Sequence, residues 1–249
     1  MKKIISVGRG GVGKTTFIAG LSLLLKERGP LLIIDADPDE NLSYFLGIEE
    51  DLKSISEILF NIKEAKIKKE LERLPLAEKI DYLIQQEALY ERDFFDFLSL
   101  GVKWTEGCYC QPNNILKGII KRLEKNYNFV LIDSPAGLEH INRRITTELD
   151  YIFVLLDPSQ KSLDSVERFK RLLKDLRIKF KEIFLIGNFR YPESKLHLIQ
   201  EKTGSSYLAK LPYDKKVEEL SLKGEPFTKL SPNSLFLKEI EKIIKEVRL

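Results

Sequence analysis

Four residues near the start of the chain have the types and the spacing of a phosphate-binding loop. The pattern G-x-x-x-x-G-K-[ST] is satisfied by Gly8, Gly13, Lys14 and Thr15. An apolar strand is expected before the loop and a helix after it, so backbone N–H groups and a helix N-terminus would face a bound anion. In such a loop the lysine reaches the β- and γ-phosphates, and the threonine hydroxyl ligates Mg²⁺. The motif therefore predicts a nucleoside triphosphate site.

The elements that must position this loop follow from the hydrophobic pattern. Short β-branched apolar runs alternate with amphipathic stretches, which is typical of a parallel sheet covered by helices. Strands are expected at residues 4–7, 31–34, 95–98, 129–132, 151–156, 183–186 and 207–209, and helices at residues 14–28, 115–125, 163–176, 217–222 and 235–247. A stretch at about residues 49–92 is helical in period and shows no strand pattern, so we interpret it as a helical insertion. We expect one α/β domain over residues 1–249, with a mostly parallel sheet and helices on both faces.

Length, charge and hydropathy exclude several classes of protein. The chain has 249 residues with 41 Lys or Arg and 38 Asp or Glu, which gives a formal charge of +3. A charge this small and this evenly interspersed does not indicate a nucleic-acid surface. No uncharged run near the start approaches the ~20 residues of a membrane helix. The first apolar stretch breaks at Gly8 and Arg9, before a secretory signal could form. We expect a cytoplasmic protein without nucleic-acid or membrane partners.

The wider loop, GRGGVGKTT at residues 8–16, resembles the deviant Walker A loop of the superclass that contains MinD, ParA and the nitrogenase iron protein. The resemblance implies a P-loop ATPase fold of the MinD and nitrogenase-iron-protein type. It also implies nucleotide contacts from Gly10, Gly11, Val12, Gly13, Lys14, Thr15 and Thr16. The superclass has a lysine near the loop's start that reaches across a dimer, and this chain has Arg9 there. Arginine carries the same charge with a fork suited to phosphate, so the resemblance implies that Arg9 acts on a partner's nucleotide.

Acidic residues after two of the expected strands fit the same superclass. The Asp-Ala-Asp-Pro run at residues 35–38 resembles its switch I. The resemblance gives Asp37 the role of orienting or activating the attacking water and Asp35 that of supporting Mg²⁺ through its water shell. Asp133 ends an apolar run in the Walker B arrangement, beside Mg²⁺. Residues 133–137 resemble switch II of the superclass, in which Gly137 would sense the γ-phosphate. The alternative for Asp37 is a simple turn and helix cap.

Three residues late in the chain resemble the superclass's base site. Asn188 follows the strand expected at residues 183–186 and resembles the asparagine that binds adenine. Pro212 and Asp214 resemble the loop that closes over the base. Each could instead belong to an ordinary turn. No guanine-specific motif is seen, so ATP is the expected nucleotide.

Two cysteines, Cys108 and Cys110, lie two residues apart and are the chain's only ones. A structural disulfide is disfavoured in a reducing cytosol, and so short a ring would be strained. In an extended segment residues i and i+2 point to the same side, so both thiolates could face one ion. Two thiolates do not complete a tetrahedral site, but a two-fold dimer would supply four. A redox dithiol and incidental thiols remain the alternatives.

A narrower resemblance, to the CooC family, is carried by the Cys-x-Cys pair within residues 107–110 and by residues 113–114, 132–133, 136–140, 143–144 and 157–159. CooC proteins are ATPases that serve nickel insertion into carbon monoxide dehydrogenase, and the likeness runs from residue 2 to about residue 227. It implies a homodimer formed on ATP or metal binding, with Ni²⁺ or Zn²⁺ held by Cys108 and Cys110 of both chains. It also implies a nickel enzyme such as carbon monoxide dehydrogenase as client. Residues 134–137 differ from the family's usual pattern, which would suit a different client.

Two other functions are open for a chain of this superclass. A MinD-like or ParA-like positioning ATPase would use a C-terminal amphipathic helix at a membrane, and it leaves the cysteines without a role. An iron–sulfur electron donor needs cysteines on well-separated loops, whereas these two lie two residues apart.

Overall fold

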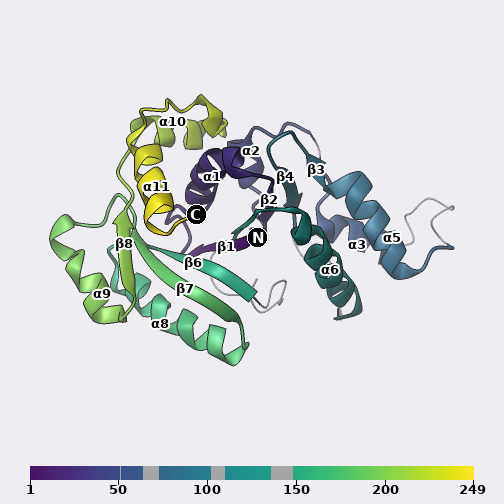
Figure 1. Cartoon of the computed structure of the whole chain (residues 1–249), viewed down its shortest axis with the longest axis horizontal. Helices are drawn as coiled ribbons and strands as arrows, with labels where there is room; N and C mark the ends of the chain where they lie inside the picture. The colour runs from purple at the N-terminus through teal and green to yellow at the C-terminus, as the bar shows by residue number, and fades with distance from the viewer. Residues whose placement is uncertain (51, 64–72, 102–109, 136–147) are drawn as a thin grey trace.

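One eight-stranded sheet forms the centre of the protein (Figure 1). The computed structural model describes residues 1–50, 52–63, 73–101, 110–135 and 148–249, with only the backbone for residues 110–116. The strand order is β3-β4-β2-β5-β1-β6-β7-β8, in which β3 pairs antiparallel with β4 and every other pairing is parallel. The strands are β1 (Lys2–Gly8), β2 (Leu31–Asp35), β3 (Tyr90–Glu91), β4 (Asp96–Ser99), β5 (Phe129–Asp133), β6 (Glu148–Leu156), β7 (Lys179–Gly187) and β8 (Ser206–Lys210).

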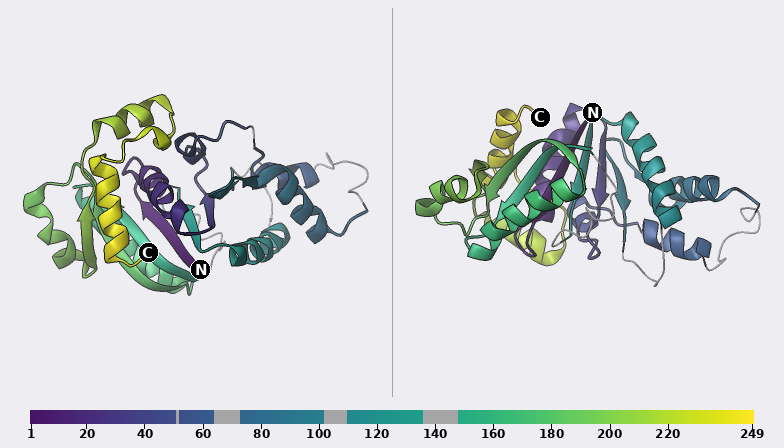
Figure 2. Two further views of the ribbon diagram at one scale, coloured as in Figure 1. Left: turned by 45° about the horizontal axis from the view of Figure 1, so that its top comes forward. Right: turned by 90° about the horizontal axis from the view of Figure 1, so that it is seen from below.

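Helices cover both faces of the sheet, as a mostly parallel sheet requires. On one face lie α1 (Lys14–Leu25), α2 (Leu42–Leu46), α10 (Lys215–Lys223) and α11 (Leu235–Glu246). On the other face lie α3 (Ile55–Lys63), α5 (Leu76–Leu83), α6 (Cys110–Leu123), α8 (Gln160–Asp175) and α9 (His197–Thr203). Figure 2 shows α11 and α8 on opposite sides of the strands. None of the helices in the described ranges is long and apolar enough to cross a membrane.

Alternation along the central strands divides the core into two clusters. Ile4 packs with α1 and α11, whereas its neighbour Ile5 packs with the helices of the opposite face. The same alternation separates Ile33 from Ile34 in β2. Successive side chains of a strand point to opposite faces, so strands buried on both faces must be apolar at every position. This requirement is the reason that the apolar runs predicted the central strands.

The α/β fold with a mostly parallel sheet is confirmed, with three short elements missed. The stretch at residues 49–92 was expected to contain no strand, and this expectation is wrong because β3 lies within it. This strand has two residues and pairs only at the sheet edge, too short for a period to be visible. Helices α2 and α9, with five and seven residues, were missed for the same reason. Interpreting residues 49–92 as an insertion into a single domain stays a prediction.

Candidate nucleotide site

The loop between β1 and α1 has the backbone conformation of a phosphate cradle. Gly8 has a φ of 152°, and a Cβ there would lie 2.6 Å from the carbonyl oxygen of Leu155. Gly13, the residue before α1, has a φ of 103°. Both positions disfavour residues with a side chain, so the glycine spacing in the motif is a backbone requirement. The loop leaves α1 with its N-terminal N–H groups at the carboxyl end of the central strand, where an anion is stabilised.

Lys14, the first residue of α1, is a buried cation. The residue is 5% exposed, and its Nζ donates a hydrogen bond to the carbonyl oxygen of Arg9 at 3.2 Å. Burial lowers the pKa of Lys14, while the nearby carboxylates of Asp133 and Asp37 partly oppose this effect. A buried ammonium gains free energy from any anion that reaches it. The position therefore suits the phosphates that the motif predicts.

Asp133 lies at the centre of the site because β5 pairs with both β1 and β2. It stands opposite Ser6 of β1 and Asp35 of β2 in the sheet register. Its carboxylate accepts hydrogen bonds from Thr15 Oγ1 at 2.6 Å and from Ser6 Oγ at 3.0 Å. Burial raises the pKa of Asp133 to about 6 in spite of these two hydrogen bonds. The contact between Thr15 and Asp133 joins the two residues expected beside Mg²⁺; sequence reasoning missed Ser6, which carries no motif signal.

Asp35 organises the loop that follows β2. Its Oδ1 accepts from the N–H of Asp37 at 2.9 Å and its Oδ2 from the N–H of Leu42 at 3.1 Å. Burial, and next the charge of Asp133, raise the pKa of Asp35 well above its ordinary value. The Asp37 carboxylate accepts from the N–H of Asp39 at 3.2 Å, so Asp37 also lies in a local turn. Asp35 thus brings Asp37 back toward the phosphate loop.

The donor set around Thr15 fits Mg²⁺. Two buried carboxylates and a hydroxyl are hard oxygen donors, and Mg²⁺ is held in such sites by one or two carboxylates together with substrate phosphates. The described residues contain no group of three or more His, Cys, Asp or Glu side chains that could hold a metal ion by themselves. Water and the phosphates of a nucleotide would supply the remaining ligands.

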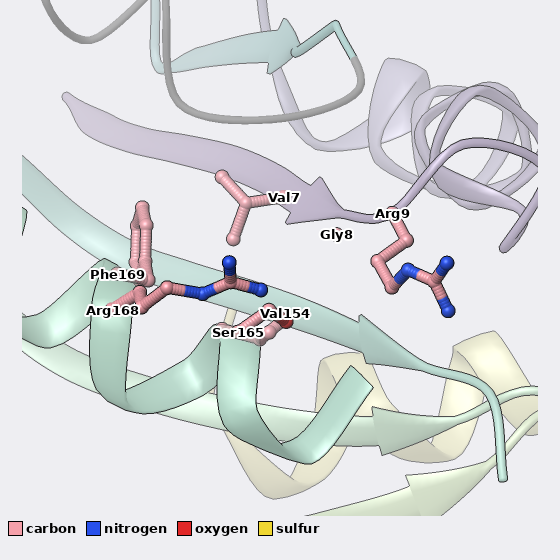
Figure 3. A pocket seen from close by; sticks show the side chains of 7 residues that line it. All are labelled: Val7, Gly8, Arg9, Val154, Ser165, Arg168 and Phe169. Carbon is pink, nitrogen blue, oxygen red and sulfur yellow. The ribbon is translucent and has the colours of Figure 1, made fainter. Parts of the chain in front are cut away.

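Arg9, the first residue after β1, contacts the turn that follows β6. Its Nη1 donates to Ser159 Oγ at 2.9 Å and lies 3.5 Å from Asp157 Oδ2. Arg9 also lines one end of a cavity of about 300 Å³ between β1, β6 and α8. In Figure 3 its guanidinium points away from Arg168, which lines the same cavity. The sequence marked Arg9 and the Asp-Pro-Ser run separately but did not predict their contact.

Asn188, expected near the base, is held by hydrogen bonds with backbone groups. It is 4% exposed, and its Oδ1 accepts from the N–H of Arg190 at 3.1 Å. The side chains of Phe189 and Tyr213 beside it are half exposed, with their ring centroids 5.6 Å apart. The loop that carries Asn188 therefore lies next to the loop of Pro212 and Asp214.

Asp214 caps a helix. Its Oδ1 accepts from the N–H groups of Lys216 and Val217, and its Oδ2 accepts from Ser234 Oγ at 2.6 Å. Burial opposes ionisation, but the hydrogen bonds from Ser234 and the backbone outweigh it and lower the pKa of Asp214. Both oxygens thus join the starts of α10 and α11, and a role in base binding stays a prediction.

The metal-binding prediction falls largely outside the described residues. Cys108 lies in an undescribed segment, and only the backbone of Cys110 is described. Gly137, predicted to sense the γ-phosphate, also lies outside the described residues. Cys110 is the first residue of α6, so the expected extended conformation is wrong at this cysteine. Helix α6 begins five residues earlier than the periodicity predicted.

A strand, a glycine loop, a helix and a buried carboxylate on the neighbouring strand together define a P-loop nucleotide-binding protein. The AAA domain family model (AAA_31) matches residues 2–186. The chain belongs to this family and is a P-loop ATPase of the MinD/ParA type.

Three relatives illustrate the similarity. An uncharacterised ATP-binding protein of Methanocaldococcus jannaschii is 39% identical over 251 residues, which cover 98% of each chain. The carbon monoxide dehydrogenase accessory protein CooC of Rhodospirillum rubrum is 27% identical over 240 residues, covering 92% of this chain and 90% of that protein. The structure of the septum site-determining protein MinD of Pyrococcus horikoshii, complexed with Mg-ADP, matches with a TM-score of 0.70 at 24% identity, over 99% of this chain and 95% of that chain.

Proposed function

We propose that this ATPase assists nickel insertion into carbon monoxide dehydrogenase or a related nickel enzyme. The observation that carries the proposal is the pair Cys108 and Cys110 in a chain that aligns along 90% of the length of CooC, a carbon monoxide dehydrogenase accessory protein. Thiolates are ligands that soft divalent ions prefer, whereas ATP hydrolysis by itself needs none. A cysteine pair in a P-loop ATPase is thus best explained by a metal cargo.

The phosphate end of the site would bind ATP with Mg²⁺. The backbone of residues 10–16 would surround the phosphates, and Lys14 would pair with the β- and γ-phosphates. Thr15 and Asp133, already in contact at 2.6 Å, would hold Mg²⁺, which when bound neutralises charge on the phosphates. Asp37 would orient the attacking water. We expect slow, Mg²⁺-dependent hydrolysis.

A homodimer would complete two parts of the molecule. Arg9 has a half-exposed side chain at the edge of the phosphate loop, from which it would reach the partner's nucleotide. Two Cys-x-Cys segments would supply four thiolates to one Ni²⁺ or Zn²⁺ ion, the number of ligands that such an ion prefers. Nucleotide binding and cargo binding would then share one assembly.

The test is the metal stoichiometry of the purified, reduced chain. We expect about one Ni²⁺ per two chains, with metal-induced dimerisation seen by light scattering. Cys108→Ala and Cys110→Ala should each lose most Ni²⁺ binding and keep ATP binding. Lys14→Ala is the control with the opposite expectation, because it should keep Ni²⁺ binding and lose ATP binding. One tightly bound ion per chain without a change in mass, or full binding by the double alanine variant, would overturn the proposal.

The second candidate is a positioning ATPase like MinD, which the match to the Pyrococcus horikoshii structure favours. Such a function would use the apolar side of α11 at a membrane. Phe236, Ile240 and Ile244 of α11 are at most 2% exposed and belong to the core against α1. Packing within the fold already accounts for this face, so we place the positioning function second.

A further inference from the structure

The guanidinium of Arg9 is held within its own chain by a single nitrogen. Nη1 carries two N–H groups, and it makes both of the contacts described above, with Ser159 Oγ at 2.9 Å and with Asp157 Oδ2 at 3.5 Å. These acceptors come from the turn between β6 and α8, 148 and 150 residues away along the sequence. The pairing of β1 with β6 brings the two segments together.

The turn is fixed without any help from Arg9. Asp157 Oδ1 accepts from the N–H of Ser159 at 2.8 Å, and the N–H of Asp157 donates to Ser162 Oγ at 3.1 Å. Ser159 is the N-cap of α8, and its Oγ accepts from the N–H of Ser162 at 3.2 Å. An acceptor fixed in this way defines the direction of the donor that binds it.

The rest of the guanidinium remains available. Within the described part of the chain, no hydrogen bond engages Nε or Nη2 of Arg9, and the side chain is 42% exposed. These two nitrogens form the planar pair that matches the oxygens of a phosphate or carboxylate. Figure 3 shows the guanidinium at one end of the cavity between β1 and α8, pointing away from Arg168 and Phe169.

We propose that Ser159, with Asp157 beside it, is a positioning residue that holds Arg9 by Nη1 so that Nε and Nη2 are presented to a phosphate group from outside this chain. The inference rests on the proposed action of Arg9 on a partner's nucleotide. This arrangement gives arginine an advantage at position 9. Nη1 can stay hydrogen-bonded to Ser159 while Nε and Nη2 bind an anion. A lysine has a single nitrogen for both.

The experiment measures the dissociation constant of the ATP-dependent dimer by light scattering, together with kcat and KM of ATP hydrolysis. Arg9→Ala should weaken the dimer most, and Arg9→Lys should resemble it. Ser159→Ala should weaken the dimer by about 25-fold, since one ordinary hydrogen bond, worth about fivefold, is lost in each of the two chains, and Ser159→Thr should restore it. In the Arg9→Ala background, Ser159→Ala should have no further effect on the dimer, since the positioned group is gone.

A control variant tests the loss of a hydroxyl near Ser159 that does not contact Arg9. Ser165→Ala removes the hydroxyl that donates to the carbonyl oxygen of Ser162 at 2.6 Å, and it should leave the dimer unchanged. The loss of the N-cap in Ser159→Ala is separated from positioning by the Arg9→Ala background, in which an effect of the cap alone would persist. If Arg9→Ala dimerises like the parent, both the proposed action of Arg9 and this inference are wrong. If Arg9→Ala weakens the dimer and Ser159→Ala does not, or if the effect of Ser159→Ala persists without Arg9, the inference alone is overturned.

Discussion

The phosphate end and the expected base end of the site use their polar groups in opposite ways. At the phosphate end, Lys14, Asp35 and Asp133 are at most 5% exposed. Burial lowers the pKa of the lysine and raises the pKa of each carboxyl, which favours the neutral form in all three. At the base end, oxygens of Asn188 and Asp214 accept hydrogen bonds from neighbouring backbone N–H groups. Acceptors in both regions have hydrogen-bond partners, so the difference lies in burial. The phosphate end holds deeply buried ionisable groups whose charge a ligand would compensate, and the base end holds acceptors that fix a turn and a helix cap.

This difference indicates which substitutions should change ligand binding and which should change the stability of the fold. Buried charges with incomplete partners reduce stability, and a bound ion of opposite charge removes that cost. Acceptors that cap helices stabilise the fold whether or not a ligand is present. Substitutions at the phosphate end should therefore change binding and pH dependence, and substitutions at the base end should change stability.

The largest expected effect is at Lys14. Lys14→Ala removes the buried cation that pairs with the β- and γ-phosphates, and ATP affinity should fall by about 100-fold or more. Asp37→Ala should keep ATP affinity and lower kcat by roughly 100-fold, if Asp37 acts only on the attacking water. Equilibrium binding of a fluorescent ATP analogue and steady-state hydrolysis measure the two quantities. Equal losses of affinity in both variants would remove Asp37 from a catalytic role.

The next effect is a pH dependence due to Asp133. Since burial raises its pKa in the folded state from 3.8 to about 6, the folded chain binds a proton that the unfolded chain releases. Its contribution to the free energy of unfolding is therefore largest below the unfolded pKa and is lost as pH rises through about 6, by roughly 3 kcal/mol at most. Urea unfolding in EDTA without nucleotide, from pH 4.5 to 7.5, measures the trend.

Asp133→Asn provides the comparison for this trend. The amide has no charge to bury, so the difference in unfolding free energy between parent and variant should vary across this pH range. Carboxylates remote from Asp133, such as Asp150 and Asp214, cancel in the difference. Asp35 does not cancel, because the charge of Asp133 contributes to its raised pKa, so the difference reports the pair. A difference that is constant with pH would show that Asp133 does not titrate in this range.

The smallest effect is expected at Asp214. Asp214→Ala removes the acceptor that caps α10 and contacts Ser234, so unfolding free energy should fall by about 1 kcal/mol and Tm by about 2–4 °C. Asp214→Asn keeps a capping oxygen and should recover most of the loss. Thermal unfolding and ATP binding are both measured. A loss of ATP affinity without a change in Tm would instead assign Asp214 to the base site.

The sequence was sufficient where one local stretch determines the geometry. The phosphate loop is contiguous, and Asp133 is predicted because residues 129–132 must form a buried strand that ends there. Contacts between distant segments were not predictable from local patterns. Ser159 meets Arg9 only because β6 pairs with β1, and the cap at Asp214 depends on where α11 begins. Short elements such as β3 lack enough residues to display a period.

The central claim, that the ATPase cycle controls a metal cargo, is tested most directly by measuring Ni²⁺ affinity with and without nucleotide. The reduced parent chain would be titrated against a chromophoric chelator, alone and with Mg²⁺ and a non-hydrolysable ATP analogue. Coupled sites change each other's affinity reciprocally, commonly by about 5-fold to 150-fold. We predict a change of at least about fivefold in the parent and none in Lys14→Ala. Equal Ni²⁺ affinities with and without the analogue in the parent chain would contradict the account.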